Sequence, residues 1–156
     1  MTSTIALDSQ SIAIDLYHLL RELDPAHWKA DAQDWAHQRA VDIQEKLHTL
    51  QTQLSGSLEG RQWELMRERI EELKHLLETH LPHKEMAEER LRTAWNDFRL
   101  RCIPVYERYA AQLKGLDVHV PTLRPTNYAR NVFHLLSGIA VLLVFLSSTA
   151  LIASSH

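Results

Sequence analysis

The feature that most constrains this chain of 156 residues is an apolar run near its C-terminal end. From Val132 to Ala153 the chain has no Asp, Glu, Lys or Arg. A helix of about twenty apolar residues crosses a hydrocarbon core roughly 30 Å thick. The Leu, Ile, Val and Phe side chains here contribute on the order of -4 to -8 kcal/mol to insertion. A buried core helix is the alternative, but such helices are usually shorter. We therefore expect one transmembrane helix over residues 128–156.

Basic residues on one side of this run indicate its orientation. Lys114, Arg124 and Arg130 precede the run, whereas no Lys or Arg follows it. Flanks that are richer in Lys and Arg stay in the cytoplasm, so we expect the N-terminal part to be cytoplasmic. Tyr side chains are enriched at the headgroup level. Arg124, Tyr128 and Arg130 are therefore the predicted membrane-interface residues.

A proline-containing segment precedes the predicted span. Pro121 and Pro125 restrict the backbone of residues 116–127 to extended conformations. Thr126 or Asn127 can cap the helix that follows. We expect residues 116–127 to form a short, stiff connector.

The composition of residues 1–115 favours helices, because Gly, Pro and runs of β-branched residues are scarce there. Apolar residues recur at spacings of three and four, which is typical of helices with one buried face. Asp24 and Pro25 are suited to begin a helix, Pro104 to kink or divide one, and Gly115 to end one. The predicted helices cover about 9–23, 25–54, 58–81 and 91–113.

The loops between these helices are short, so neighbouring helices are expected to be antiparallel. The second and third would form a hairpin, and the first and fourth would cover it. The sequence therefore predicts an all-α protein: a small antiparallel bundle or coiled-coil hairpin in residues 1–115, followed by one C-terminal transmembrane helix.

Several functions find no support in the composition. The net charge of -3 is small and mixed in sign, so no nucleic-acid partner is expected. The single cysteine, Cys102, cannot form an internal disulfide, which fits a reducing compartment. The N-terminus lacks the basic region of a secretory signal. No glycine-rich phosphate loop or serine elbow is present either.

Two Glu-x-x-His motifs, Glu45 with His48 and Glu72 with His75, resemble the ligand pairs of di-iron bundles. At 100° per residue, both pairs lie about 140–200° from the apolar stripe of their helix. They should therefore face away from the core, and no metal site or other cofactor site is expected in this chain. Cys102 is expected to be a small buried hydrophobe.

His134 lies about one turn inside the predicted span. Ionisable residues within a span are costly and are often functional. The alternative is that His134 remains neutral near the headgroups.

The segment RPTNYARNVFHLLSGIAVLL resembles the entry to the first membrane helix of dolichol kinases, phytol kinases and phosphatidate cytidylyltransferase-like enzymes. Arg130, Phe133 and His134 match the pattern, and so do Ser137 and Gly138. Asn131 stands where the family usually has lysine. The resemblance implies CTP-dependent chemistry on a membrane lipid with a divalent metal. Arg130 and His134 would then be catalytic candidates at the cytoplasmic mouth of the site.

Two functional hypotheses follow. The first is a single-pass membrane protein whose cytoplasmic bundle binds a protein partner and has no catalytic site of its own. The second is the N-terminal fragment of a CTP-dependent lipid kinase or cytidylyltransferase. Enzymes of that family need several further membrane helices, so the chain as given would be catalytically incomplete. Its partners would be the lipid bilayer and either a protein bound by the bundle or the further membrane helices.

Overall fold

The computed structural model describes residues 2–29, 31–55, 60–123, 138–144 and 147. These residues contain helices and no strand, which confirms the all-α prediction. Residues 138–144 form a short helical segment. The four longer helices are α1 (Thr2–Glu22), α2 (Ala32–Ser55), α3 (Arg61–His80) and α4 (Glu88–Gly115).

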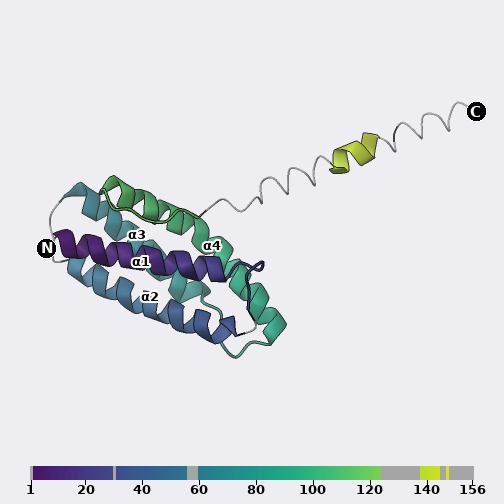
Figure 1. The fold of residues 1–156 in the computed structure, drawn as a ribbon, viewed down its shortest axis with the longest axis horizontal. Helices are drawn as coiled ribbons and strands as arrows, with labels where there is room; N and C mark the ends of the chain where they lie inside the picture. The colour runs from purple at the N-terminus through teal and green to yellow at the C-terminus, as the bar shows by residue number, and fades with distance from the viewer. Residues whose placement is uncertain (1, 30, 56–59, 124–137, 145–146, 148–156) are drawn as a thin grey trace, which may run out of the picture. The chain divides into compact units, whose positions relative to one another are not determined.

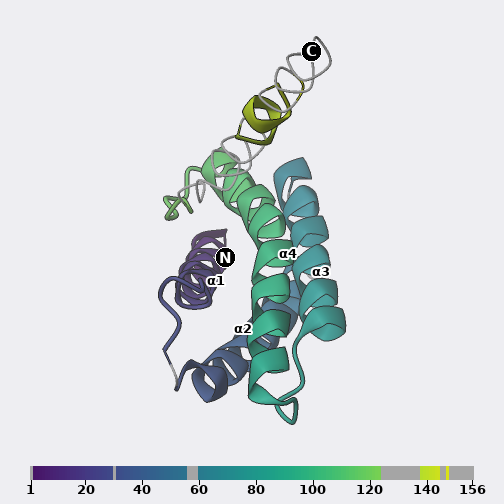
Figure 2. The ribbon, with the colours of Figure 1, turned by 90° about the vertical axis from the view of Figure 1, so that its right-hand side faces the viewer.

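The chain divides into two compact units, Met1–Leu123 and Arg124–His156. In the first unit, α1 packs against α2 and α4, and α3 packs against α2 and α4 (Figures 1 and 2). Neighbouring helices run antiparallel. Ser9 of α1 meets Tyr109 of α4, whereas Leu20 meets Arg99, so the numbering rises on one helix and falls on the other. The result is an up-and-down bundle of four helices.

The core of the bundle consists of the apolar stripes of the four helices. The stripes of α2 and α3 follow the spacing of three and four that the sequence predicts. The largest fully buried side chains come mainly from α1 and α4, which lie over the α2 and α3 pair. They include Trp95, Tyr106, Tyr109, Phe98, Ile12, Leu16, Leu19 and Leu20.

The second helix begins later than the sequence predicts. Asp24 and Pro25 do not start it, because residues 23–27 form turns and α2 begins at Ala32. The Asp24 carboxylate accepts a hydrogen bond from the backbone N–H of Ala26 at 3.0 Å, and its carbonyl accepts one from His27 at 2.8 Å. These local bonds close a turn instead of opening a helix.

A buried arginine ties this turn to α4. Arg99 is 6% exposed, and its Nε donates to the Leu20 carbonyl at 2.9 Å. Leu20 lies in the last turn of α1, where carbonyls lack intrahelical partners. The Arg99 Nη2 atom lies 2.9 Å from Oδ2 of Asp24. One side chain therefore caps the end of α1 and holds the α1–α2 corner against α4.

α4 ends at Gly115, the residue that the sequence predicts to end it, but Gly115 is not in the left-handed cap conformation. α4 is continuous through Pro104, whose side of the helix is exposed. The left-handed residue at its end is Asp117 (φ 60°), not Gly115. Val118 donates to the Leu113 carbonyl and Asp117 to the Lys114 carbonyl. This pair of bonds is the Schellman motif, which requires a left-handed residue two positions after the last helical one.

After this motif the chain turns back along the bundle. Residues 118–123, which we call the strap, run extended beside α1 and α4 (Figure 1). Val120 is 2% exposed. Gln10 Nε2 donates to the His119 carbonyl at 2.7 Å, and Tyr106 Oη donates to the Pro121 carbonyl at 2.5 Å. The first part of the predicted connector is therefore extended and packed against the helices.

The described part of the second unit is a short apolar helical segment, 138–144. Its large side chains are 52–65% exposed: Ile139, Val141, Leu142, Leu143 and Val144. Within the described ranges no helix combines the length and the apolar character that a membrane crossing requires. Most of the predicted transmembrane helix, 128–156, lies outside these ranges.

Candidate functional site

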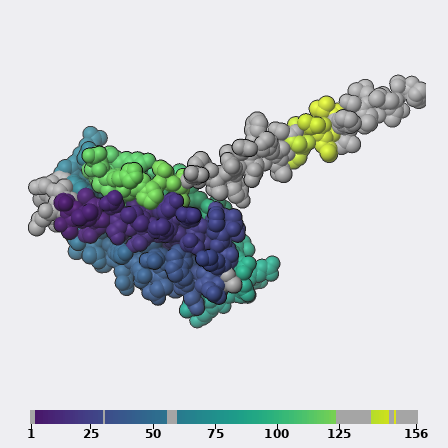
Figure 3. All heavy atoms as spheres, viewed as in Figure 1, coloured from purple at the N-terminus to yellow at the C-terminus, as the bar shows by residue number. Residues whose placement is uncertain are grey.

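The outer face of α1 is less charged than the exposed face of α3. Its exposed positions between residues 3 and 18 carry no Asp, Glu, Lys or Arg. Leu7 is 61% exposed and Ile14 is 37% exposed, two turns apart on the same side of the helix. Figure 3 shows α1, in purple, open on this face of the molecule beside α2. We call this face the α1 stripe: Thr4, Leu7, Ser11, Ile14 and His18.

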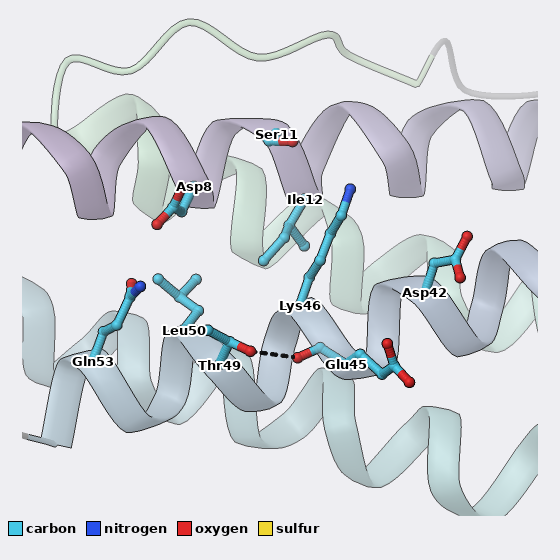
Figure 4. A pocket seen from close by; sticks show the side chains of 9 residues that line it. All are labelled: Asp8, Ser11, Ile12, Asp42, Glu45, Lys46, Thr49, Leu50 and Gln53. Carbon is cyan, nitrogen blue, oxygen red and sulfur yellow. Dashed lines mark hydrogen bonds between the residues drawn. The ribbon is translucent and has the colours of Figure 1, made fainter.

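A groove of about 450 Å³ lies between α1 and α2 along one edge of the α1 stripe. Figure 4 shows Asp8 extending from α1 toward α2, and Lys46 extending from α2 toward α1. The buried side chains of Ile12 and Leu50 also line the groove. The remaining lining residues are polar: Ser11, Asp42, Glu45, Thr49 and Gln53.

The groove has an excess of negative charge. Asp8, Asp42 and Glu45 take part in none of the ion pairs formed among the described residues. Asp42 accepts only a neutral hydrogen bond, from Gln38 at 3.0 Å. Lys46 is the single basic residue of the lining, and its Nζ lies 2.5 Å from Oδ2 of Asp15, farther along α1. The three carboxylates therefore remain available to a positively charged partner.

Farther along α1 and α2, Asp15 of α1 pairs with two basic residues of α2, Lys46 and Arg39. Asp15 also faces Arg39 Nη1 at 3.8 Å. The Arg39 guanidinium lies 5.7 Å from the Trp35 ring centroid, within the range of a cation–π contact. Arg39 is thereby held between a carboxylate and an aromatic ring.

The residues that the sequence singled out for membrane chemistry lie outside the described ranges. These are Arg124, Tyr128, Arg130 and His134. Their predicted roles at the interface and as catalytic candidates remain predictions.

The Glu-x-x-His pairs point away from the core. Glu45, His48 and His75 are exposed, and Glu72 is half-buried. Glu72 accepts hydrogen bonds from Arg69 and Arg108. Partial burial by itself would raise the pKa of Glu72, but the bonds from Arg108 and Arg69 outweigh it and lower the pKa. Glu72 therefore pairs α3 with α4, and no group of three potential metal ligands occurs in the described part of the chain.

Cys102 lies in the core of the bundle, 1% exposed. Burial raises the pKa of its thiol far above the ordinary value. A neutral, inaccessible thiol is a poor nucleophile. Cys102 therefore acts as a small packing residue in the core.

The sequence signal for the α1 stripe was present but incomplete. The predicted first helix began near residue 9, which left Leu7 outside it. Its apolar stripe of Ile12, Leu16, Leu19 and Leu20 is indeed buried. Ile14 is part of the same helix on the opposite side, and its exposure becomes visible only once the neighbours of α1 are known.

No protein-family model, curated protein or solved structure matches this chain. The resemblance around Arg130 and His134 therefore stays a prediction.

Proposed function

We propose that the protein is a single-pass membrane protein whose helical bundle lies in the cytoplasm and binds a protein partner. The bundle has no catalytic site in this proposal. The observation that carries it is the uncharged run after Arg130, whose described residues 138–144 expose large aliphatic side chains.

The arrangement of these side chains favours lipid over a groove in another protein. Four consecutive residues, Val141 to Val144, are 62–65% exposed. At 100° per residue they point around the whole circumference of the helix. An amphipathic helix buries one face in a partner, whereas a bilayer surrounds a helix on every side. Exposed apolar surface of this kind is what a membrane span requires.

The flanking residues support the orientation. Arg124 and Arg130 precede the uncharged run. Basic residues on this flank support a cytoplasmic location for the bundle. Tyr128 is suited to the headgroup region on the same side.

The experiment is carbonate extraction of membranes from cells that express the full chain. We expect the protein to stay in the membrane pellet. Replacing Leu142 and Leu143 with Arg adds roughly 6–8 kcal/mol to the cost of insertion, so this variant should move to the supernatant. The matched control is Leu100→Arg, which adds a charge at an exposed position of α4. Release of the wild-type chain by carbonate would overturn the proposal.

The resemblance to CTP-dependent lipid kinases and cytidylyltransferases supports a second candidate through Arg130 and His134. It would make this chain the front part of an enzyme. His134→Ala would then abolish CTP-dependent turnover of a lipid alcohol or phosphatidate once the further spans are present. An anchor without catalysis would keep both its extraction behaviour and its partner binding in that variant. An antibody against the bundle, used on membranes of the source cells, would show whether a longer multi-span protein exists.

A further inference from the structure

The α1 stripe is a helix face without a partner in the bundle. Exposed positions of α3 include Arg61, Glu64, Glu68, Glu71 and Glu78, which is the ordinary charged surface of a soluble helix. The corresponding positions of α1 are Ser, Thr, Leu, Ile and His over residues 3–18. Two aliphatic side chains seven residues apart match the spacing with which one helix contacts another.

The unpaired carboxylates beside this face determine which partner fits it. Asp8, Asp42 and Glu45 line the groove along the α2 edge of the stripe, and none of them has a cation among the described residues. A partner that covers Leu7 and Ile14 brings its own flank over these carboxylates. Basic side chains on that flank would be attracted, and acidic ones repelled.

We propose that the α1 stripe and the adjoining groove bind an amphipathic helix of a partner protein that carries Lys or Arg along one edge. Its apolar residues would cover Leu7 and Ile14, and its basic edge would lie over Asp8, Asp42 and Glu45. This inference rests on the proposed function and specifies the kind of partner that the bundle binds.

Charge argues against two other occupants of the α1 stripe, a second copy of the chain and a membrane surface. In an antiparallel pair of α1 helices from two copies, the edge with Asp8 faces the same edge of the other copy, so like charges meet. A membrane surface containing anionic lipids would be repelled by the carboxylates of the groove, because both are negatively charged. A basic helix is the occupant whose charge complements this edge.

A face of this size forms a modest interface. Leu7 and Ile14 are about 10 Å apart along the helix axis, which corresponds to two turns of a partner helix. Interfaces of this kind lie at the small end of the range and belong to transient complexes. We therefore expect binding that weakens as the salt concentration rises, because exposed charges contribute to it.

The test places a photo-crosslinking amino acid at Leu7 or Ile14 of the full chain in its own cell membranes. The matched control is Leu100 on α4, since Leu100 and Ile14 are 39% and 37% exposed. We expect protein adducts from Leu7 and Ile14 but not from Leu100. Mass spectrometry should place the adduct on a segment with helical apolar spacing and Lys or Arg along one edge.

Charge reversal provides the second measurement. Asp8→Lys combined with Asp42→Lys should reduce the adduct from Ile14 at least fivefold. The control reverses Glu64 and Glu78, two exposed positions of α3, and gives the same net charge. The control should leave the adduct unchanged.

The other outcomes overturn the inference. These are an adduct between two copies of the chain, adducts with lipid, an acidic or non-helical cross-linked segment, equal labelling from Leu100, or no adduct. Carbonate extraction of the same membranes reports separately on the anchor. A failure of this inference is thereby distinguishable from a failure of the proposed function.

Discussion

Arg99 and Asp24 form the most buried ion pair among the described residues, although they lie 75 positions apart in the sequence. The side chains are 8% and 18% exposed, with 2.9 Å between Nη2 and Oδ2. Asp24 also bonds the Ala26 N–H, and Arg99 also bonds the Leu20 carbonyl. The pair therefore joins the end of α1, the turn that follows it and the middle of α4.

Arg99→Ala should destabilise the bundle by about 3 kcal/mol, because it leaves the Asp24 carboxylate without its cation and the Leu20 carbonyl without its donor. Urea unfolding followed by circular dichroism measures the change. The control is Arg92→Ala. Arg92 forms an exposed pair with Glu88, which should contribute less than about 1 kcal/mol. Equal effects of the two substitutions would show that the Arg99 pair does not hold the corner.

The end of α4 gives a prediction that distinguishes the observed cap from the expected one. Gly115 is helical, and an added Cβ would meet nothing within 4 Å. Gly115→Ala should therefore stabilise the bundle by about 0.5–1 kcal/mol. Asp117 has φ 60°, so Asp117→Val should destabilise the bundle by about 1–2 kcal/mol. Asp117→Gly, the control, should be tolerated. A loss of stability in Gly115→Ala would place the cap at Gly115 instead.

The tyrosines of α4 predict a loss of stability at alkaline pH. Burial, with the neighbouring Tyr17, raises the pKa of Tyr106 to about 12 from its ordinary value near 10. Burial also raises the pKa of Tyr109 above its usual range, against the opposing bond to Ser9. The unfolded chain then loses these protons first, so the free energy of unfolding falls as the pH rises from 10 toward 12.

The matched variant for this prediction is Tyr106→Phe. At pH 8 it should be about 1 kcal/mol less stable than the wild type, because the Pro121 carbonyl loses its donor. Between pH 10 and 12 this difference should shrink, since Phe does not titrate. Unfolding curves at pH 8, 10 and 11.5 measure it. A constant difference over this range would contradict the raised pKa.

Cys102 predicts slow thiol chemistry in the folded bundle. The raised pKa and the burial of Cys102 keep it neutral and out of reach of water-soluble reagents. Reaction with a disulfide reagent at pH 8 should require unfolding, so the rate should rise with urea. Arg99→Ala should speed the reaction by lowering the cost of opening. Rapid reaction in the native wild type would contradict this packing.

Most of the helical framework was predictable, because apolar residues spaced by three and four lie on one face when the chain is helical. Burying that face against other helices then forms the bundle. The stripe of α3 begins and ends close to where its spacing predicts, and the stripe of α2 ends there, although α2 itself starts at Ala32. Pro104 did not break α4, because proline on the exposed side removes one hydrogen bond while the core side of the helix stays packed.

The sequence was misleading where a side chain interacts with a residue that is distant in the sequence. Asp24 and Pro25 have the chemistry of a helix start, yet Asp24 serves a turn and the buried Arg99. Val118 and Val120 in the strap are apolar at alternate positions, a weak signal for an extended segment with one covered side. Only the packed helices reveal what covers them. The exposure of the α1 stripe could not be predicted either, because it depends on which helices pack against α1.

The path of the strap has a mechanical consequence. Any pull on the segment that follows Leu123 reaches the bundle through the strap before it reaches α4. The strap contacts the bundle through Pro121, Val120 and His119, one after another along the chain. Force applied from the C-terminal side would therefore break these contacts in sequence, starting with that of Pro121. Because these contacts are few, the strap would detach from α1 and α4 before the helices unfold.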